Sequence, residues 1–237
     1  MVIEYSLQLD DGRSFLFRVD LDRKFDALVD AAEHPFWTKL EFKQCENCPL
    51  AKEQFRHCPV ALDIEQIITT FRSILSYQNV DVEVRTEERA YVKRTDAQTA
   101  LRSVMGLLMA TSACPILSRL KGLARFHLPF ASVEETIFRT TGAYLIQQFY
   151  VFREGGTPDL ELKGLDELYA DLQLVNRCFK GRIDAASEMD ANMNAIASLV
   201  YLAMGVSFSL ADKLEEMRSL LSIPPPPTRQ PRLPSGL

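Results

Sequence analysis

The chain has 237 residues, of which 47% are hydrophobic and 25% are charged, and its formal net charge is −5. This composition is typical of a folded globular protein and excludes a chain that is disordered throughout. Because the chain is acidic and has no local run of Lys or Arg, we expect no binding to nucleic acid, whose phosphates carry the same sign of charge.

Residues 1–20 alternate apolar and polar side chains and lack the apolar segment of a secretory signal, so we expect a cytoplasmic protein. Residues 103–118 and 195–211 contain no charged side chain, and the second stretch reaches the lower length limit of a membrane-spanning helix. Both stretches contain Ser and Gly and adjoin polar helical sequence. We therefore interpret them as buried core helices and expect no membrane partner.

The first part of the chain predicts two β-hairpins, one more strand and two helices. Residues 2–9 and 14–21 alternate around the turn sequence Asp10-Asp11-Gly12, which is a strong hairpin signal. Residues 25–33 have helical spacing, and residues 37–42 alternate again as an expected further strand. A helix with a broad apolar face should start at Pro59. Residues 80–85 and 89–93 predict the second hairpin.

From Thr95 onward the apolar residues follow a helical period. Thr95 and Gln98 form a capping-box pattern before one helix, and Ser132 and Glu135 form a second such pattern before another. Further helices are expected around residues 165–179 and 191–222, the last as one long helix or two abutting ones. The prolines at 224–227 end this pattern.

These patterns predict an α+β fold. We expect a small N-terminal mixed α/β unit, residues 1–94, of two hairpins plus one strand and two helices, with a cysteine loop at its rim. An all-helical bundle, residues 95–222, follows it. Residues 223–237 form a Pro-rich tail.

Four of the five cysteines lie in three similar contexts: Cys45-x2-Cys48-Pro49, Cys58-Pro59 and Cys114-Pro115. In a reducing compartment, a C-x2-C pair indicates metal binding or redox chemistry rather than a disulfide framework. Two thiolates at this spacing can bind one ion. We therefore predict that Cys45, Cys48, Cys58 and Cys114 bind one metal ion.

Several alternatives stay open at this metal site. The fourth ligand is either Cys114 or His57, and we favour Cys114 because His57 is adjacent to Cys58. Zinc is the expected ion, since four thiolates complete a tetrahedral structural site. An iron-sulfur cluster is the alternative, because Cys-Pro also occurs at cluster ligands. The other interpretations are small buried thiols without a metal and a C-x2-C redox pair.

Residues 125–130, Arg-Phe-His-Leu-Pro-Phe, precede a predicted helix start and offer a second candidate site. Arg125 and His127 could bind an anion or another ligand beside the free N–H groups of that helix. The alternative is aromatic packing, with His127 bonded to a backbone carbonyl. The sequence contains no P-loop and no common hydrolase or dinucleotide motif, so an enzyme is not the favoured interpretation.

The favoured function is a binding or regulatory module that is stabilised by the bound metal ion and acts on an unknown protein or small-molecule partner. The alternative is an iron-sulfur or redox protein, or an enzyme, whose site combines Arg125 and His127 with the cysteines.

Five segments together resemble one known family. The segments are 45–50 (CENCPL), 58–61 (CPVA), 105–115 (MGLLMATSACP), 124–130 (ARFHLPF) and 159–162 (DLEL). On these motifs the chain to about residue 222 resembles an uncharacterised bacterial family of unknown function. That family often has Gly where this chain has Ala113, which is a minor departure. The resemblance implies family membership and no particular activity.

Overall fold

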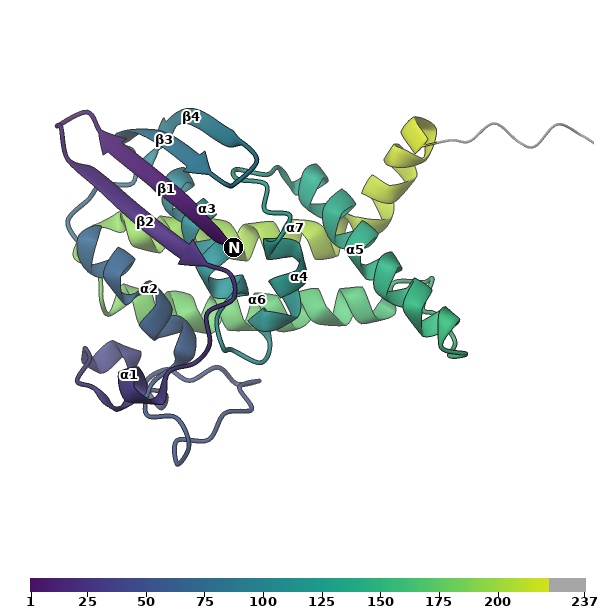
Figure 1. The fold of residues 1–237 in the computed structure, drawn as a ribbon, viewed down its shortest axis with the longest axis horizontal. Coiled ribbons are helices and arrows are strands. Elements are labelled where there is room, and N and C mark those ends of the chain that lie inside the picture. The colour runs from purple at the N-terminus through teal and green to yellow at the C-terminus, as the bar shows by residue number, and fades with distance from the viewer. Residues whose placement is uncertain (222–237) are drawn as a thin grey trace, which may run out of the picture.

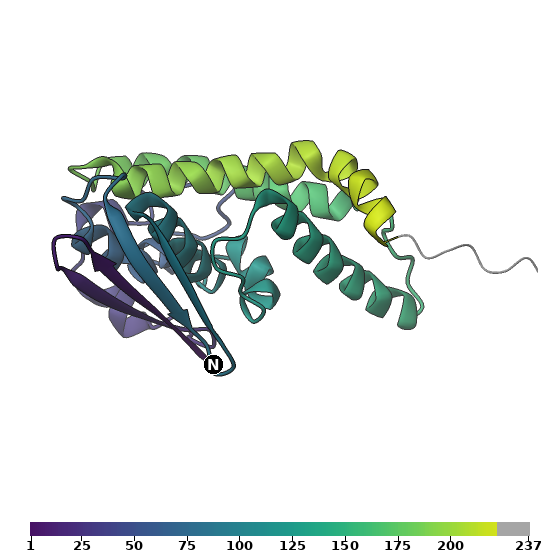
Figure 2. The same cartoon turned by 90° about the horizontal axis from the view of Figure 1, so that it is seen from above.

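A computed structural model of the chain describes residues 1–221, so the predicted tail at 223–237 lies outside the described residues. The fold is α+β, as the sequence predicts. A four-stranded antiparallel sheet with short helices lies at one end of the molecule, and three long helices extend away from it (Figures 1 and 2).

The sheet has the strand order β2-β1-β3-β4, with β1 at Val2–Leu9, β2 at Ser14–Asp20, β3 at Asn79–Arg85 and β4 at Ala90–Asp96. Both predicted hairpins are confirmed, and β1 also pairs with β3. The alternate residues of β1 are buried on one face, where Ile3, Tyr5 and Leu7 enter the core. This burial at every second position is the physical origin of the alternation seen in the sequence.

The expected strand at residues 37–42 is wrong. The chain forms a short 3-10 helix at Phe36–Thr38 (η1), and the following backbone makes a single bridge, between Lys39 and His57. The carbonyl oxygens of this segment are used elsewhere: those of Trp37, Lys39 and Leu40 accept hydrogen bonds from the Arg182 guanidinium. The alternation therefore reflects burial in an irregular segment.

The helices that cover the sheet are α2 at Pro59–Thr70 and α3 at Ala97–Ala110. Pro59 occupies the first turn of α2, as predicted. The N-cap of α3 is Asp96 and not Thr95, because Thr95 still pairs with Val80 in the sheet while the Asp96 carboxylate accepts from Thr99 N at 2.8 Å. A short helix, α1 at Ala27–Ala31, covers only part of the predicted range of 25–33.

Beyond α3 the chain makes the turn η2 at Leu117–Leu120 and the short helix α4 at Lys121–Ala124. The long helices α5 at Val133–Arg153, α6 at Lys163–Asp184 and α7 at Asp190–Leu221 follow. The predicted capping box of Ser132 and Glu135 is present at the start of α5. Helix α7 is continuous, and α6 runs antiparallel beside it (Figure 1).

One hydrophobic cluster connects the inner face of the sheet with α2, α3, α6 and α7. In the described part of the chain, α7 is the one helix that is long and apolar enough to cross a membrane, over residues 190–218. About 28% of its most apolar window is buried inside the protein. Core helices of soluble proteins meet the same criterion, so this finding is weak evidence for a membrane span.

Candidate functional site

The four predicted metal ligands lie on three separate local structures. Cys45 and Cys48 share a tight turn, and the Cys45 thiol faces the Val175 carbonyl of α6 at 4.0 Å. Cys58 caps the start of α2, where its N–H donates to Thr38 O at 2.8 Å. Cys114 follows the end of α3. All five cysteines, including Cys178, are free and partly buried.

The predicted meeting of four sulfurs around one point is not found. Within residues 1–221, no group of three or more His, Cys, Asp or Glu side chains is arranged to hold a metal ion. The Cys-Pro repetition has another explanation, because Cys58 and Cys114 each precede a helical turn that begins with Pro. Backbone N–H groups of those turns lie against the two sulfurs. Proline suits the first position of such a turn.

The alternative ligand, His57, is also engaged elsewhere. Its Nδ1 lies 2.8 Å from Asp30 O, and its backbone N–H donates to the Asp30 carboxylate at 2.8 Å. The ring is buried and packs edge-on against His34. His57 therefore joins the α1 segment to the start of α2.

Arg182 of α6 is the largest fully buried side chain in the described structure. Its guanidinium donates to the carbonyls of Trp37, Lys39 and Leu40, and it makes no ion pair with a carboxylate of residues 1–221. Burial lowers its pKa, and nearby Cys58, Cys45 and Cys48 oppose that shift. Burial in turn raises the pKa of Cys58, which the Arg182 charge opposes. A buried cation therefore lies near the thiols of Cys58 and Cys45, whose burial favours their neutral form.

Arg125 and His127 do not form a shared anion site. The Arg125 side chain is exposed and pairs with Asp22, with 2.6 Å between Nη2 and Oδ1. His127 instead turns inward, where its Nε2 is hydrogen-bonded to the Tyr5 hydroxyl of β1. The same hydroxyl lies 2.8 Å from Ser103 Oγ on α3.

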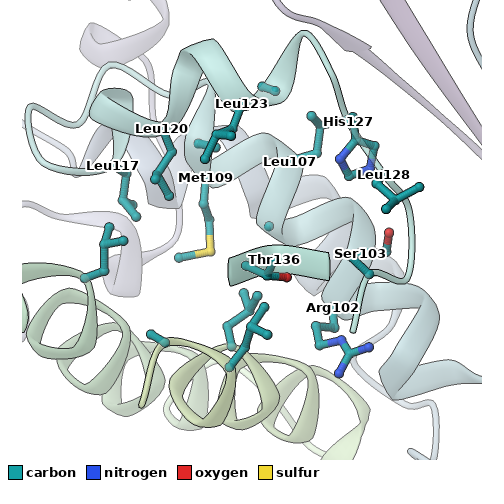
Figure 3. Close-up of a pocket in the computed structure, with 18 of the residues that line it drawn as sticks. Arg102, Ser103, Leu107, Met109, Leu117, Leu120, Leu123, His127, Leu128 and Thr136 are labelled. Carbon is teal, nitrogen blue, oxygen red and sulfur yellow. The ribbon is translucent and has the colours of Figure 1, made fainter. Parts of the chain in front are cut away.

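His127 lines a partly open cavity of about 190 Å³, whose other walls come from α3, η2, α4 and the three long helices. Figure 3 shows Arg102, Ser103 and His127 toward one end, with Leu107 and Leu128 beside His127, whereas Leu117 and Leu120 lie toward the other end and Thr136 lies between. The Met109 side chain reaches between them. The cavity is thus amphiphilic.

The hydrogen bonds at the polar end form a chain from Ser103 through Tyr5 to His127. Ser103 Oγ also accepts from Phe130 N at 3.3 Å. The tautomer of the neutral His127 ring sets the direction of its bond with the Tyr5 hydroxyl, because only one ring nitrogen carries a proton. Burial raises the pKa of Tyr5 and lowers that of His127 to about 3, so both groups are neutral at pH 7. Such a weak base is poorly suited to proton transfer at neutral pH.

The charged groups of the cavity are all basic. Arg102 and Arg139 line it, and no Asp or Glu is among the described residues of its wall. The Arg139 side chain donates to Leu123 O and Phe126 O, at 3.1 and 2.6 Å, while the Arg102 side chain makes no hydrogen bond or ion pair within the described residues. Burial lowers the pKa of Arg139. An anionic group would complement this end of the cavity.

Sequence reasoning found His127 but missed Arg102 and Tyr5. Arg102 is the one charged residue within the otherwise uncharged α3, which was an available signal. Tyr5 lies within the alternating residues 2–9, but its bond to a residue 122 positions away could not be inferred from a local pattern.

Comparisons with known proteins agree with the resemblance seen in the motifs. A family described as a domain of unknown function, DUF6901, matches residues 3–222. No curated protein matches the chain. No solved structure matches it either. Because the match covers nearly all of the described chain, this protein belongs to the DUF6901 family.

Proposed function

We propose that this protein is a binding module for a small, largely apolar carboxylate, which it holds in the cavity between α3 and the long helices. The observation that carries the proposal is that this cavity is lined mainly by apolar side chains, has Arg102 and His127 toward one end, and has no acidic residue among the described residues of its wall. Ligand sites typically combine apolar walls with a few polar groups that fix orientation.

The size of the cavity limits the ligand. It measures about 190 Å³. An engineered apolar cavity of about 150 Å³ in another protein accommodates benzene. A single ring, or a short acyl chain of comparable volume, therefore fits here together with a carboxylate.

The lining residues suggest how such a ligand would lie. Its apolar part would pack against Leu117, Leu120 and Met109, which releases water from both surfaces. Its carboxylate would face Arg102, whose charge has no partner in the described structure. In the tautomer that accepts from Tyr5 at Nε2, His127 can offer its Nδ1 proton as a second donor at that end.

Benzoate, benzene and benzylamine form a set of probes that differ in charge at similar size. We expect benzoate to bind most tightly to the full-length protein in titration calorimetry and benzylamine to bind most weakly. Arg102→Gln should weaken benzoate binding about tenfold or more, as for a lost charge-assisted hydrogen bond, and leave benzene binding unchanged.

The matched control is Arg177→Gln, which changes an exposed arginine of α6 outside the cavity. This variant should bind benzoate as the unmodified protein does. Equal affinity for the three probes, or equal loss in both arginine variants, would contradict the proposal.

Metal binding is a second proposal, with zinc as the expected ion and an iron-sulfur cluster as the alternative. It is supported by the buried Arg182 charge, which lies near Cys58, Cys45 and Cys48 and has no carboxylate partner in the described structure. Thiolates bound to a metal would supply negative charge there. The described residues are not arranged as a metal site in this structure. Metal binding would therefore require the loop that contains Cys45 and Cys48 to move.

Elemental analysis of untagged full-length protein tests this second proposal. One zinc per chain, lost in Cys48→Ser together with part of the thermal stability, would support it. Brown protein with visible absorption would support the cluster instead. Colourless protein without bound metal would contradict both.

A further inference from the structure

Helix α5 carries a row of apolar residues that the rest of the described chain covers only in part. Phe138, Gly142, Leu145, Phe149 and Phe152 follow one another at spacings of four, three, four and three. The four large side chains are between 40% and 63% exposed. This is the heptad spacing of a helix that pairs with another helix. We call these five residues the α5 seam.

The surroundings of the α5 seam are also apolar. Ile146 and Tyr150 flank it and are 61% and 59% exposed. Residues 140–152 contain no charged side chain. The C-terminal part of α5 projects from the body of the protein, away from the sheet (Figures 1 and 2). An exposed apolar surface of this kind on a folded chain indicates an interaction site.

Gly142 lies in the middle of this surface. Glycine inside a helix destabilises it by about 1 kcal/mol relative to alanine. A Cβ atom at Gly142 would meet nothing within 4 Å, so packing inside this chain does not require glycine there. Close approach of a second helix at this point would explain it, because small residues allow helix backbones to approach closely.

We infer that the α5 seam is the interface between two copies of this chain, which pair antiparallel about a twofold axis. Six large side chains at about half exposure present on the order of 600–700 Å², close to the roughly 800 Å² per partner of a stable interface. A twofold axis brings the same surface of both copies together.

The charges at the two ends of α5 favour an antiparallel arrangement of the two paired helices. Glu134 and Glu135 lie in its first turn, and Arg153 lies in its last. An antiparallel pair centred near Leu145 places Arg153 of each copy by the glutamates of the other copy. A parallel pair would place like charges side by side, which is unfavourable.

Sedimentation analysis of the full-length protein tests this interface. We expect a dimer at concentrations of about 10 µM, in the range of ordinary specific interfaces. The double variant Leu145→Glu/Phe149→Glu should be a monomer at that concentration, with an unchanged helical circular dichroism spectrum. If the double variant does not fold, the single variant Phe152→Glu at the exposed end of the α5 seam serves instead.

Phe208→Glu is the matched control, because Phe208 is an exposed phenylalanine of α7 outside the α5 seam. It should stay dimeric. A monomeric unmodified protein, or a seam variant that stays dimeric, would overturn the inference. Binding of the monomer to anionic lipid vesicles would also overturn it and assign the α5 seam to a membrane surface.

Discussion

The hydroxyl of Tyr5 on β1 and Nε2 of His127, at the cavity wall, are joined by a hydrogen bond across 122 positions of the chain. This bond connects the central part of the sheet with the polar end of the cavity. Ser103 of α3 shares the Tyr5 hydroxyl and extends the connection to the helix that lies between them. The sheet therefore fixes the position of a residue that lines the proposed ligand site.

Replacing Tyr5 by Phe should destabilise the protein by about 1–3 kcal/mol, the usual penalty for a buried polar group left without its partner. The ring would still fit, but Ser103 and His127 would each lose a hydrogen bond. Urea denaturation measures the change in the free energy of unfolding. The control Tyr201→Phe alters a tyrosine that is 71% exposed, and it should stay within about 0.5 kcal/mol. Equal effects of the two variants would contradict a structural role of the Tyr5 hydroxyl.

The protein should lose stability in acid because of His127. Its pKa is about 3 in the folded protein, against an ordinary value of 6.5, because burial and the nearby Arg139 disfavour the charged ring. As the pH falls below about 6.5, His127 therefore binds a proton in the unfolded chain but not in the folded chain. Stability is complete above about pH 6.5 and falls by up to about 1.4 kcal/mol per pH unit below it.

The variant His127→Gln lacks this titration. Between pH 7 and pH 5 the unmodified protein should lose about 2 kcal/mol more stability than the variant. Urea denaturation at both pH values measures the difference. Parallel pH profiles of the two proteins would show that His127 is not held neutral.

Arg182→Met should destabilise the protein by several kcal/mol, because three backbone carbonyls near the end of η1 would lose their donor. Losing these hydrogen bonds should make residues 37–40, which precede the loop with Cys45 and Cys48, more mobile. Faster reaction of the thiols with a thiol reagent, compared with the unmodified protein, would report that mobility. Arg177→Met, on an exposed turn of the same helix, should change neither stability nor thiol reactivity. An Arg182→Met protein as stable as this control would contradict the role given to Arg182.

Gly142→Ala separates the stability of one chain from the proposed pairing. As a monomer the variant should be more stable by about 0.5–1 kcal/mol, because alanine favours the helix and the added methyl meets open space. The added methyl should at the same time weaken the dimer. Thermal unfolding at low concentration and sedimentation at high concentration measure the two effects. A variant that dimerises as tightly as the unmodified protein would argue against close approach at Gly142.

Features that depend on neighbouring residues could be predicted from the sequence. The two hairpins follow from burial at every second position, and the capping box of Ser132 and Glu135 is a local hydrogen-bond pattern. The prediction of a strand at residues 37–42 was wrong. Three carbonyls of this segment accept hydrogen bonds from Arg182, which is more than 140 positions away in the chain. The metal site was inferred from the C-x2-C pair and the repeated Cys-Pro contexts, but Cys-Pro also precedes two helical turns, after Cys58 and after Cys114. The local sequence did not distinguish a metal-binding cysteine from a cysteine at the start of a helical turn.

The candidate cavity was still less visible in the sequence. His127 could be singled out by its setting between Gly122 and a helix cap, but its partners Tyr5 and Ser103 come from a strand and from another helix. Arg125 was equally conspicuous and turned out to bind Asp22 at the surface. Which of two neighbouring side chains turns inward depends on packing between distant elements.

The central claim is that the cavity takes up a small apolar carboxylate, and methyl NMR on methionine-labelled protein tests it most directly. The chain has seven methionines, of which Met109 lines the cavity and Met189 is exposed elsewhere. On titration with benzoate we expect a saturable shift of the Met109 methyl signal and no shift of the Met189 signal, and Met109→Leu assigns the former. A Met109 signal that does not move at millimolar benzoate, or shifts of equal size at both methionines, would contradict the claim.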